Sequence, residues 1–315
     1  MEHYIKGARH LMATQMNCNA IRNCEKLFTE FSKAYYWTNE NIRAYLELID
    51  FEGKTNALTV AASGDQAFNL ITNGIINIDT FDTNALSEFI AFGFKRAMIL
   101  KYSYNDFINV MILLRSDNLS QEHINSIISD LLPYMESRHQ VFWRTVLNYN
   151  KQAQNYYCTN LNLIRMLTLD NKFIPQYNDY LLDELHYETL RKRLGNANIT
   201  FKCVNAKDLG REFTSQYDLI LLSNILDYMF NDWGRHWDYH KLAEYERELG
   251  IILKPDGVIF LNYIFTYVVG QNDPNMLFPL SSVTKENLTD EEIHKIPKLD
   301  NSNEVDGMIL KRIQK

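Results

Sequence analysis

The stretch LTVAASGDQAFNLI (58–71) joins a strand pattern to a helix pattern through a turn of small residues. The first residues are mostly apolar or β-branched, and DQAFNLITN (65–73) has apolar residues at helical spacing. Between them, AASGD (61–65) carries almost no side-chain bulk. A chain avoids bulk where another group must approach its backbone, and a helix N-terminus presents free N–H groups. The stretch therefore predicts a strand, a turn that approaches another group closely, and a helix.

A second strand follows at IINIDTFD (75–82) and ends on Asp82. Strand, helix and strand in this order form a βαβ unit, in which the strands are parallel and the connection is right-handed. Further strand patterns lie in ITFKCVNAKDL (199–209), YDLILLSNIL (217–226), GVIFLNYIF (257–265) and DGMILKRI (306–313). The order of the patterns predicts an α/β fold with a Rossmann-like, mostly parallel sheet.

Helical patterns dominate two parts of the chain. Residues 1–54 include CEKLFTEFSKAYYW (24–37) and TNENIRAYLELI (38–49), and they predict an N-terminal helical lid. Residues 55–315 predict the α/β domain, which a large helical insertion at 85–195 interrupts between the second and third strands.

Two later segments have polar helical character. HKLAEYERELGIILKPDG (240–257) predicts a charged helix that stops at its KPDG end, and LTDEEIHKIPKLDNSNE (288–304) predicts a surface helix and loop.

The composition limits the partners and the compartment. The net charge of −7 argues against nucleic acid or an anionic membrane as the main partner. The four cysteines have no CxxC spacing, and MEHYIKGARH (1–10) lacks an apolar signal core. The longest apolar stretch, GVIFLNYIFTYVVG (257–270), is too short to span a bilayer. We therefore expect a soluble, cytoplasmic protein without a transmembrane segment.

Polar residues follow the predicted strands at the points where each strand ends. In an open α/β sheet, ligands bind at the carboxyl ends of the strands, beside the point where the strand order reverses. An acid that ends the second strand suits a ribose diol, because a carboxylate accepts two hydrogen bonds from adjacent hydroxyls. The strand ends here carry the turn at 61–65, Asp82, Asp208, and the polar set Ser223, Asn224 and Asp227. Together they predict a ligand that contains adenosine.

Five short motifs occur in the order of the class I S-adenosylmethionine-dependent methyltransferase fold, and the chain resembles that fold in this respect. They are LTVAASGDQAF (58–68), FDTNA (81–85), VNAKDL (204–209), YDLILLSN (217–224) and LKPDGVIFL (253–261). The general pattern of this fold has several glycines in the first turn and an acid in the first strand. This chain has Gly64 alone in the turn and Thr59 in the strand.

A narrower set of motifs resembles the S-adenosylmethionine:diacylglycerol 3-amino-3-carboxypropyltransferases of betaine-lipid synthesis and their bacterial relatives. The motifs are YYWTNENIRAYL (35–46), AASGDQAFNLI (61–71), IDTFDTNALSEFIAFGFKRAMI (78–99), KYSYNDF (101–107) and LLSNILDYM (221–229). The resemblance covers most of residues 27–265.

The resemblance implies a binding site for S-adenosylmethionine as co-substrate. The residues that it places against the methionine part are Ala61, Ser63, Gly64, Ser223 and Asn224. Asp82, with Thr83 and Asn84 beside it, would hold the ribose, and Asp208 and Leu209 would flank the adenine. Tyr36, Thr38 and Asn39 would close over the ligand, although helix capping and core packing account for these three equally well.

The resemblance also implies transfer of the 3-amino-3-carboxypropyl group to a small-molecule or lipid-like acceptor. Displacement at any of the three carbons on the sulfonium turns it into a neutral thioether, so methyl transfer and cleavage or cyclisation of the co-substrate stay open. A non-catalytic binding protein is the alternative outside enzymes. A hydroxyl acceptor needs a base, for which Asp227, Asp65 and His236 are the candidates. His236 and His240 lie four apart without a third ligand spacing, so no metal site is predicted.

Overall fold

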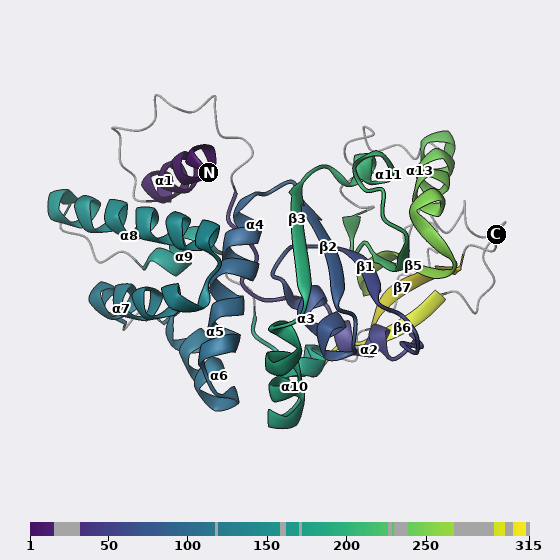
Figure 1. The fold of residues 1–315 in the computed structure, drawn as a ribbon, viewed down its shortest axis with the longest axis horizontal. Coiled ribbons are helices and arrows are strands. Elements are labelled where there is room, and N and C mark those ends of the chain that lie inside the picture. Colours follow the sequence, from purple (N-terminus) through teal and green to yellow (C-terminus); the bar gives the residue numbers. More distant parts are fainter. Residues whose placement is uncertain are drawn as a thin grey trace.

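The fold is built on a seven-stranded sheet in the order β3-β2-β1-β4-β5-β7-β6 (Figure 1). The structure is a computed structural model that describes residues 1–15, 32–116, 119–157, 162–169, 172–225, 229, 239–267, 293–299 and 305–312. The strands are β1 (Asn56–Val60), β2 (Asn77–Asp82), β3 (Asn198–Cys203), β4 (Tyr217–Leu221), β5 (Leu253–Tyr267), β6 (Ile293–Pro297) and β7 (Val305–Arg312). The first five are parallel, whereas β7 is antiparallel to both β5 and β6. This is a Rossmann-like class I methyltransferase sheet, and it confirms the predicted fold class.

The central strands are buried on both faces, which explains their continuous apolar sequence. All five residues of β4 are buried, and its side chains alternate between two apolar clusters. Leu219 and Leu221 join the cluster that contains α3 (Asp65–Thr72) and α10 (Glu184–Leu194). Ile220 joins the cluster that contains residues of α11 (Leu209–Glu212) and α13 (Tyr239–Ile252). The sheet therefore has a helical layer on each face, as Figure 1 shows.

The chain between β2 and β3 is helical, as the sequence predicted. Its elements are α4 (Leu86–Glu88), the π-helix η2 (Phe89–Lys95), α5 (Arg96–Lys101), α6 (Tyr104–Leu113), α7 (Gln121–Leu131), η3 (Leu132–Tyr134), α8 (Ser137–Tyr157), α9 (Leu163–Leu167), η4 (Pro175–Tyr177), η5 (Asp179–Leu181) and α10. Figure 1 shows α5 to α8 gathered to one side of the sheet, near α1 (Glu2–Gln15). One continuous apolar cluster contains residues of α1, the insertion and the sheet.

The N-terminal segment is less helical than its sequence predicted. Of the predicted helix 24–37, residues 32–37 are described, and they are not helical. Ala34 instead forms a parallel bridge with Thr168, with hydrogen bonds from Ala34 N to Leu167 O and from Leu169 N to Ala34 O. The next helix, α2 (Ile42–Leu46), is shorter than the predicted 38–49 and begins after Asn41, whose side chain accepts a hydrogen bond from Ala44 N at 3.2 Å. Pairing with the insertion outweighs the helical spacing of the apolar residues here.

The end of the chain also differs from the prediction. IHKIP (293–297), expected in a surface helix and loop, forms β6 at the sheet edge. Ile296 is buried there, and all five residues pair with β7. In the part of the chain that the structure describes, no helix is both long and apolar enough to cross a bilayer.

Candidate functional site

A cavity of about 710 Å³ opens at the carboxyl ends of β1, β2 and β4. This is the point where the sheet order reverses, because β1 lies between β2 and β4. The N-terminal segment contributes Leu11, Ser32, Lys33, Tyr35, Trp37, Thr38, Asn39 and Glu40 to its lining. The strand ends contribute Val60–Ser63, Gln66, Phe81–Asn84, Ser87, Val204–Ala206, Ser223–Ile225 and Met229, and the insertion contributes Leu169.

The small-residue turn after β1 forms part of the cavity wall. Ala61, Ala62 and Ser63 line the cavity. The backbone N of Ala61 donates a hydrogen bond of 2.8 Å to the backbone O of Phe81. Gly64 has a φ of 82° and is not among the lining residues. A Cβ at Gly64 would lie 2.8 Å from Cβ of Ala91, which belongs to η2. The glycine therefore permits contact with the insertion, and the predicted approach of its backbone to a ligand does not follow from this geometry.

Asp82 ends β2 and lines the cavity, as expected from its place in the sequence. Its Oδ2 accepts a hydrogen bond from Ala62 N at 3.1 Å, and its Oδ1 accepts one from Asn84 N at 2.9 Å. Burial raises the pKa of the Asp82 carboxyl, while these hydrogen bonds and others from Ser87 and Thr83 oppose the rise. Thr83 and Asn84 line the cavity beside it.

The residues after β3 reach the cavity earlier than predicted. β3 ends at Cys203, and Val204, Asn205 and Ala206 are the residues that line the cavity. Asp208 and Leu209 are not among the lining residues, and Leu209 is fully buried in the apolar core. The sequence pattern placed the strand end several residues too late, so Val204, Asn205 and Ala206 line the cavity where Asp208 and Leu209 were expected.

Ser223 and Asn224, after β4, both line the cavity. Ser223 has a φ of 56°, in the left-handed region that a residue with a side chain adopts at a cost. Its hydroxyl donates a hydrogen bond to Oε1 of Glu40. The candidate bases Asp227 and His236 lie outside the described residues.

The extended N-terminal segment alternates its side chains between the cavity and the core. Lys33, Tyr35 and Trp37 line the cavity, whereas Tyr36 is fully buried and points the other way. The Tyr36 hydroxyl donates to the backbone O of Met111 at 3.2 Å. Tyr36 is therefore a packing residue in the core and not a lining residue, which corrects its predicted place over the ligand.

The other two predicted lid residues lie at the cavity, and their closing over a ligand stays a prediction. Thr38 and Asn39 line the cavity next to the extended segment. The backbone N of Thr38 donates to Oδ2 of Asp65 at 2.8 Å, which fixes this part of the segment over the turn.

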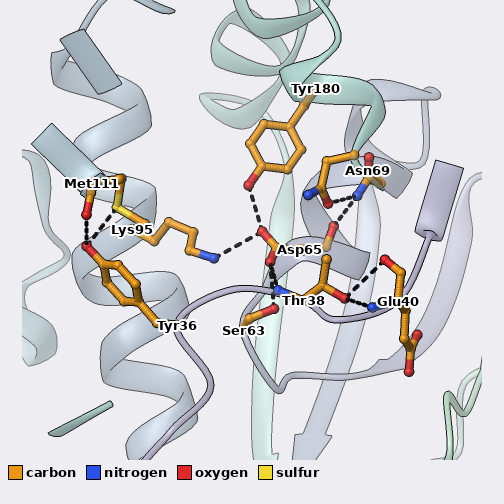
Figure 2. Close-up of polar contacts among 10 residues, drawn as sticks. Tyr36, Thr38, Glu40, Ser63, Asp65, Asn69, Lys95, Met111 and Tyr180 are labelled. Atoms are coloured by element: carbon orange, nitrogen blue, oxygen red, sulfur yellow. Dashed lines mark hydrogen bonds and ion pairs between the residues drawn. The ribbon is translucent and has the colours of Figure 1, made fainter. Parts of the chain in front are cut away.

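Asp65 lies behind the turn in a buried polar cluster (Figure 2). Its Oδ1 accepts hydrogen bonds from Lys95 Nζ at 3.0 Å and from the Tyr180 hydroxyl at 2.6 Å. Its Oδ2 accepts them from Thr38 N at 2.8 Å and Ser63 Oγ at 2.7 Å. Asp65 is 1% exposed and is not among the residues that line the cavity. With both oxygens occupied, Asp65 is a structural anion, and its suggested role as a base is corrected.

Burial shifts the partners of Asp65 toward their neutral forms. The pKa of Lys95 is lowered by burial, and the Asp65 carboxylate opposes that shift. The pKa of Tyr180 is raised well above its ordinary value by burial and by the same carboxylate, so its hydroxyl stays a hydrogen-bond donor.

Glu40 lines the cavity, and the sequence analysis did not single it out. It is 4% exposed, and its Oε2 accepts hydrogen bonds from Gln66 Nε2 at 3.0 Å and from the Tyr45 hydroxyl at 3.5 Å. Burial raises the pKa of Glu40 to about 7; hydrogen bonds from Ser223, Gln66 and Tyr45 lower it, and Asp306 raises it. Two features of the sequence could have pointed to Glu40. It is the acid in YYWTNENIRAYL (35–46), and Thr59 stands in the strand where the general pattern of the fold has an acid.

Among the described residues, no three histidine, cysteine, aspartate or glutamate side chains are grouped closely enough to hold a metal ion.

Comparison with known proteins does not assign this chain to a family. No protein family and no curated protein matches the chain. Among solved structures, the chain is similar to an rRNA methylase from Streptococcus thermophilus, with 8% identity, a TM-score of 0.33, and coverage of 86% of this chain and 93% of that one. It is also similar to the rRNA methyltransferase aviRa from Streptomyces viridochromogenes, with 10% identity, a TM-score of 0.33, and coverage of 85% and 80%. The strand order, and not these low scores, is the basis on which the fold is assigned.

Proposed function

We propose that the protein binds S-adenosylmethionine in this cavity and transfers one substituent of its sulfonium to an acceptor. The observation that carries the proposal is Asp82, a carboxylate at the end of β2 beside the backbone of the turn at 61–63. A ribose diol can donate two hydrogen bonds to such a carboxylate. The adenine would then extend toward Asn205 and Ala206, and the methionine part toward Ser223.

The residues present fit this ligand in polarity as well as in position. The adenosine side of the cavity has hydrogen-bonding groups at Asp82, Asn84 and Asn205, and the methionine side has Ser223 and Asn224. The proposed reaction needs in-line positioning of the acceptor and exclusion of water from the cavity. The activated carbon belongs to the co-substrate, so the protein has to orient the acceptor and remove its proton.

We propose the 3-amino-3-carboxypropyl group as the group transferred. The support is the resemblance of the motifs at 61–71, 78–99 and 221–229 to the carboxypropyltransferases of betaine-lipid synthesis. In this reaction the acceptor forms a bond to the γ-carbon, the bond from that carbon to sulfur breaks, and methylthioadenosine leaves with the electron pair. The acceptor proton passes to a base, for which Asp227 and His236 stay candidates.

The acceptor is proposed to be a small or lipid-like molecule. Leu11, Leu169, Ile225 and Met229 form an apolar part of the cavity lining, on which a hydrocarbon group can pack. The acidic net charge of −7 does not favour a nucleic acid as acceptor.

The test is to incubate the purified protein with S-adenosylmethionine, with and without a small-molecule and lipid extract, and to follow nucleosides by liquid chromatography. We expect methylthioadenosine to accumulate with the extract, above a no-enzyme control. The matched control is Asp82→Asn, which keeps the size of the side chain and removes its charge. Accumulation of S-adenosylhomocysteine would identify a methyltransferase, and methylthioadenosine without acceptor would identify cleavage or cyclisation. Failure of the wild-type protein to bind S-adenosylmethionine would refute the proposed function.

A further inference from the structure

The cavity wall beside Ser223 holds a buried carboxylate that has only neutral partners among the described residues. Glu40 accepts hydrogen bonds from Ser223 Oγ, Gln66 Nε2 and the Tyr45 hydroxyl. No lysine, arginine or histidine in the described part of the chain forms an ion pair with it. A buried carboxylate without a counter-ion costs several kcal/mol if it stays ionised, so this wall favours a cation.

The position of Glu40 matches one end of the proposed ligand. Asp82 follows β2 and Ser223 follows β4, with β1 between them. Two strand spacings separate these ends by about 10 Å. A nucleoside whose ribose lies at Asp82 can therefore extend its amino-acid chain past the turn to Ser223 and Glu40.

A hydrogen-bonded chain connects Glu40 to the first strand. The Thr59 hydroxyl donates to Oε1 of Gln66, and Nε2 of Gln66 donates to Oε2 of Glu40. Thr59 stands in the strand that carries an acid in the general methyltransferase pattern. The amide of Gln66 therefore links that strand to Glu40. This acid belongs to the N-terminal segment and lies 26 positions before Gln66 in the chain.

We propose that Glu40 binds the α-ammonium group of the methionine part of S-adenosylmethionine. This inference rests on the proposed function, because it assumes the ribose at Asp82. The ammonium supplies the counter-charge that the buried carboxylate lacks, and Ser223 and Gln66 hold that carboxylate in a fixed orientation. The raised pKa of Glu40, about 7 without ligand, is the expected property of an acid prepared for a cation.

The test compares three thioether nucleosides by titration calorimetry at pH 8. S-Adenosylhomocysteine has both the ammonium and the carboxylate, its decarboxylated form keeps the ammonium alone, and methylthioadenosine has neither. We expect Glu40→Gln to weaken binding of the first two by at least about tenfold, and to leave methylthioadenosine within about twofold. Asp82→Asn should weaken all three. Glu52→Gln, an exposed acid in a turn of the same N-terminal region, is the control for the loss of one charge.

The outcomes separate the inference from the proposed function. If wild type binds all three and Glu40→Gln changes none of them, or weakens all three equally, the role of Glu40 is refuted while the proposed function stands. If wild type binds none, both are refuted. If Glu40→Gln does not fold, as judged by circular dichroism, the affinities of the wild-type protein for these ligands provide the test. Equal affinity for decarboxylated S-adenosylhomocysteine and methylthioadenosine would then overturn the inference.

Discussion

Lys95 Nζ lies 3.0 Å from Oδ1 of Asp65, and both side chains are fully buried. The pair joins η2 of the insertion to the residue that begins α3, directly behind the turn of the cavity (Figure 2). Tyr180, from the other end of the insertion, donates to the same oxygen. The insertion therefore holds the turn from two places far apart in the sequence, through the ion pair of Lys95 and the hydrogen bond of Tyr180.

Removing one member of this pair should destabilise the fold. Lys95→Met leaves Asp65 as a buried anion without a cation, and we expect a loss of about 3–5 kcal/mol in the free energy of unfolding. The measurement is urea denaturation followed by circular dichroism. Lys6→Met, which removes an exposed pair with Glu2, should change the stability far less.

A second variant tests whether the pair itself causes the loss. Asp65→Asn combined with Lys95→Met removes both charges, so the double variant should recover part of the stability lost in Lys95→Met. The result would contradict this account if the losses in the free energy of unfolding from Lys95→Met and from Asp65→Asn simply added in the double variant.

Gly64 should tolerate a methyl group poorly. Gly64→Ala places a Cβ 2.8 Å from Cβ of Ala91 and also holds an alanine at a φ of 82°. Gly53→Ala is the matched control, because its φ is 72° and nothing lies within 4 Å of the added Cβ. We expect about 1–2 kcal/mol of destabilisation in the control from backbone strain alone, and more at Gly64. Ala91→Gly in the Gly64→Ala background should recover part of the excess, because Cε2 of Phe68 would still lie 3.1 Å from the added Cβ. Thermal denaturation measures the difference.

Ligand affinity should depend on pH through Glu40. The carboxyl has a pKa of about 7 and binds an ammonium only when ionised, so affinity for S-adenosylhomocysteine should rise through pH 7 and level off above it. Tyr45 and Asp306 are the titratable groups that act on Glu40, and Lys298 lies 3.5 Å from Asp306. Titration calorimetry between pH 5.5 and 8.5 measures the effect. Methylthioadenosine should give a flat profile over that range, and an equal slope for both ligands would count against Glu40 as the cause.

The stability of the ligand-free protein should change with pH in the opposite direction. The pKa of Glu40 is higher in the folded protein than its ordinary value of 4.5, so the folded state binds the proton more tightly. This contribution is fully present below pH 4.5 and is lost as the pH rises through about 7. Relative to wild type, Glu40→Gln should therefore gain up to about 3 kcal/mol between pH 4.5 and pH 8. Urea denaturation of both proteins at each pH gives the difference, which would be constant if Glu40 stayed ionised throughout.

The sheet could be predicted because its signals are local. The run at 58–60, the helical spacing after Asp65 and the position of Asp82 each depend on a few neighbouring residues. The strand order then places Asp82, Ser223 and Asn224 at one cavity, because the carboxyl ends of parallel strands meet at one edge.

The N-terminal segment could not be predicted in the same way. Its apolar residues have helical spacing, but the backbone of Ala34 pairs with residues of the insertion more than 130 positions later. As a result of this pairing, Tyr35 and Trp37 line the cavity, whereas the predicted Tyr36 does not. Glu40 escaped notice for a related reason, since its partners Gln66 and Ser223 come from two other parts of the fold.

The segment that carries Glu40 is also attached to the last part of the sheet. The side chain of Asn41 donates a hydrogen bond of 2.7 Å to the backbone O of Pro297, which ends β6. During synthesis, a ribosome must therefore translate β6 and β7 before this wall of the cavity has its support. A nascent chain that has emerged only through β5 has Asp82 but lacks the attachment next to Glu40. Attachment of the segment that carries Glu40 is thereby coupled to synthesis of β6.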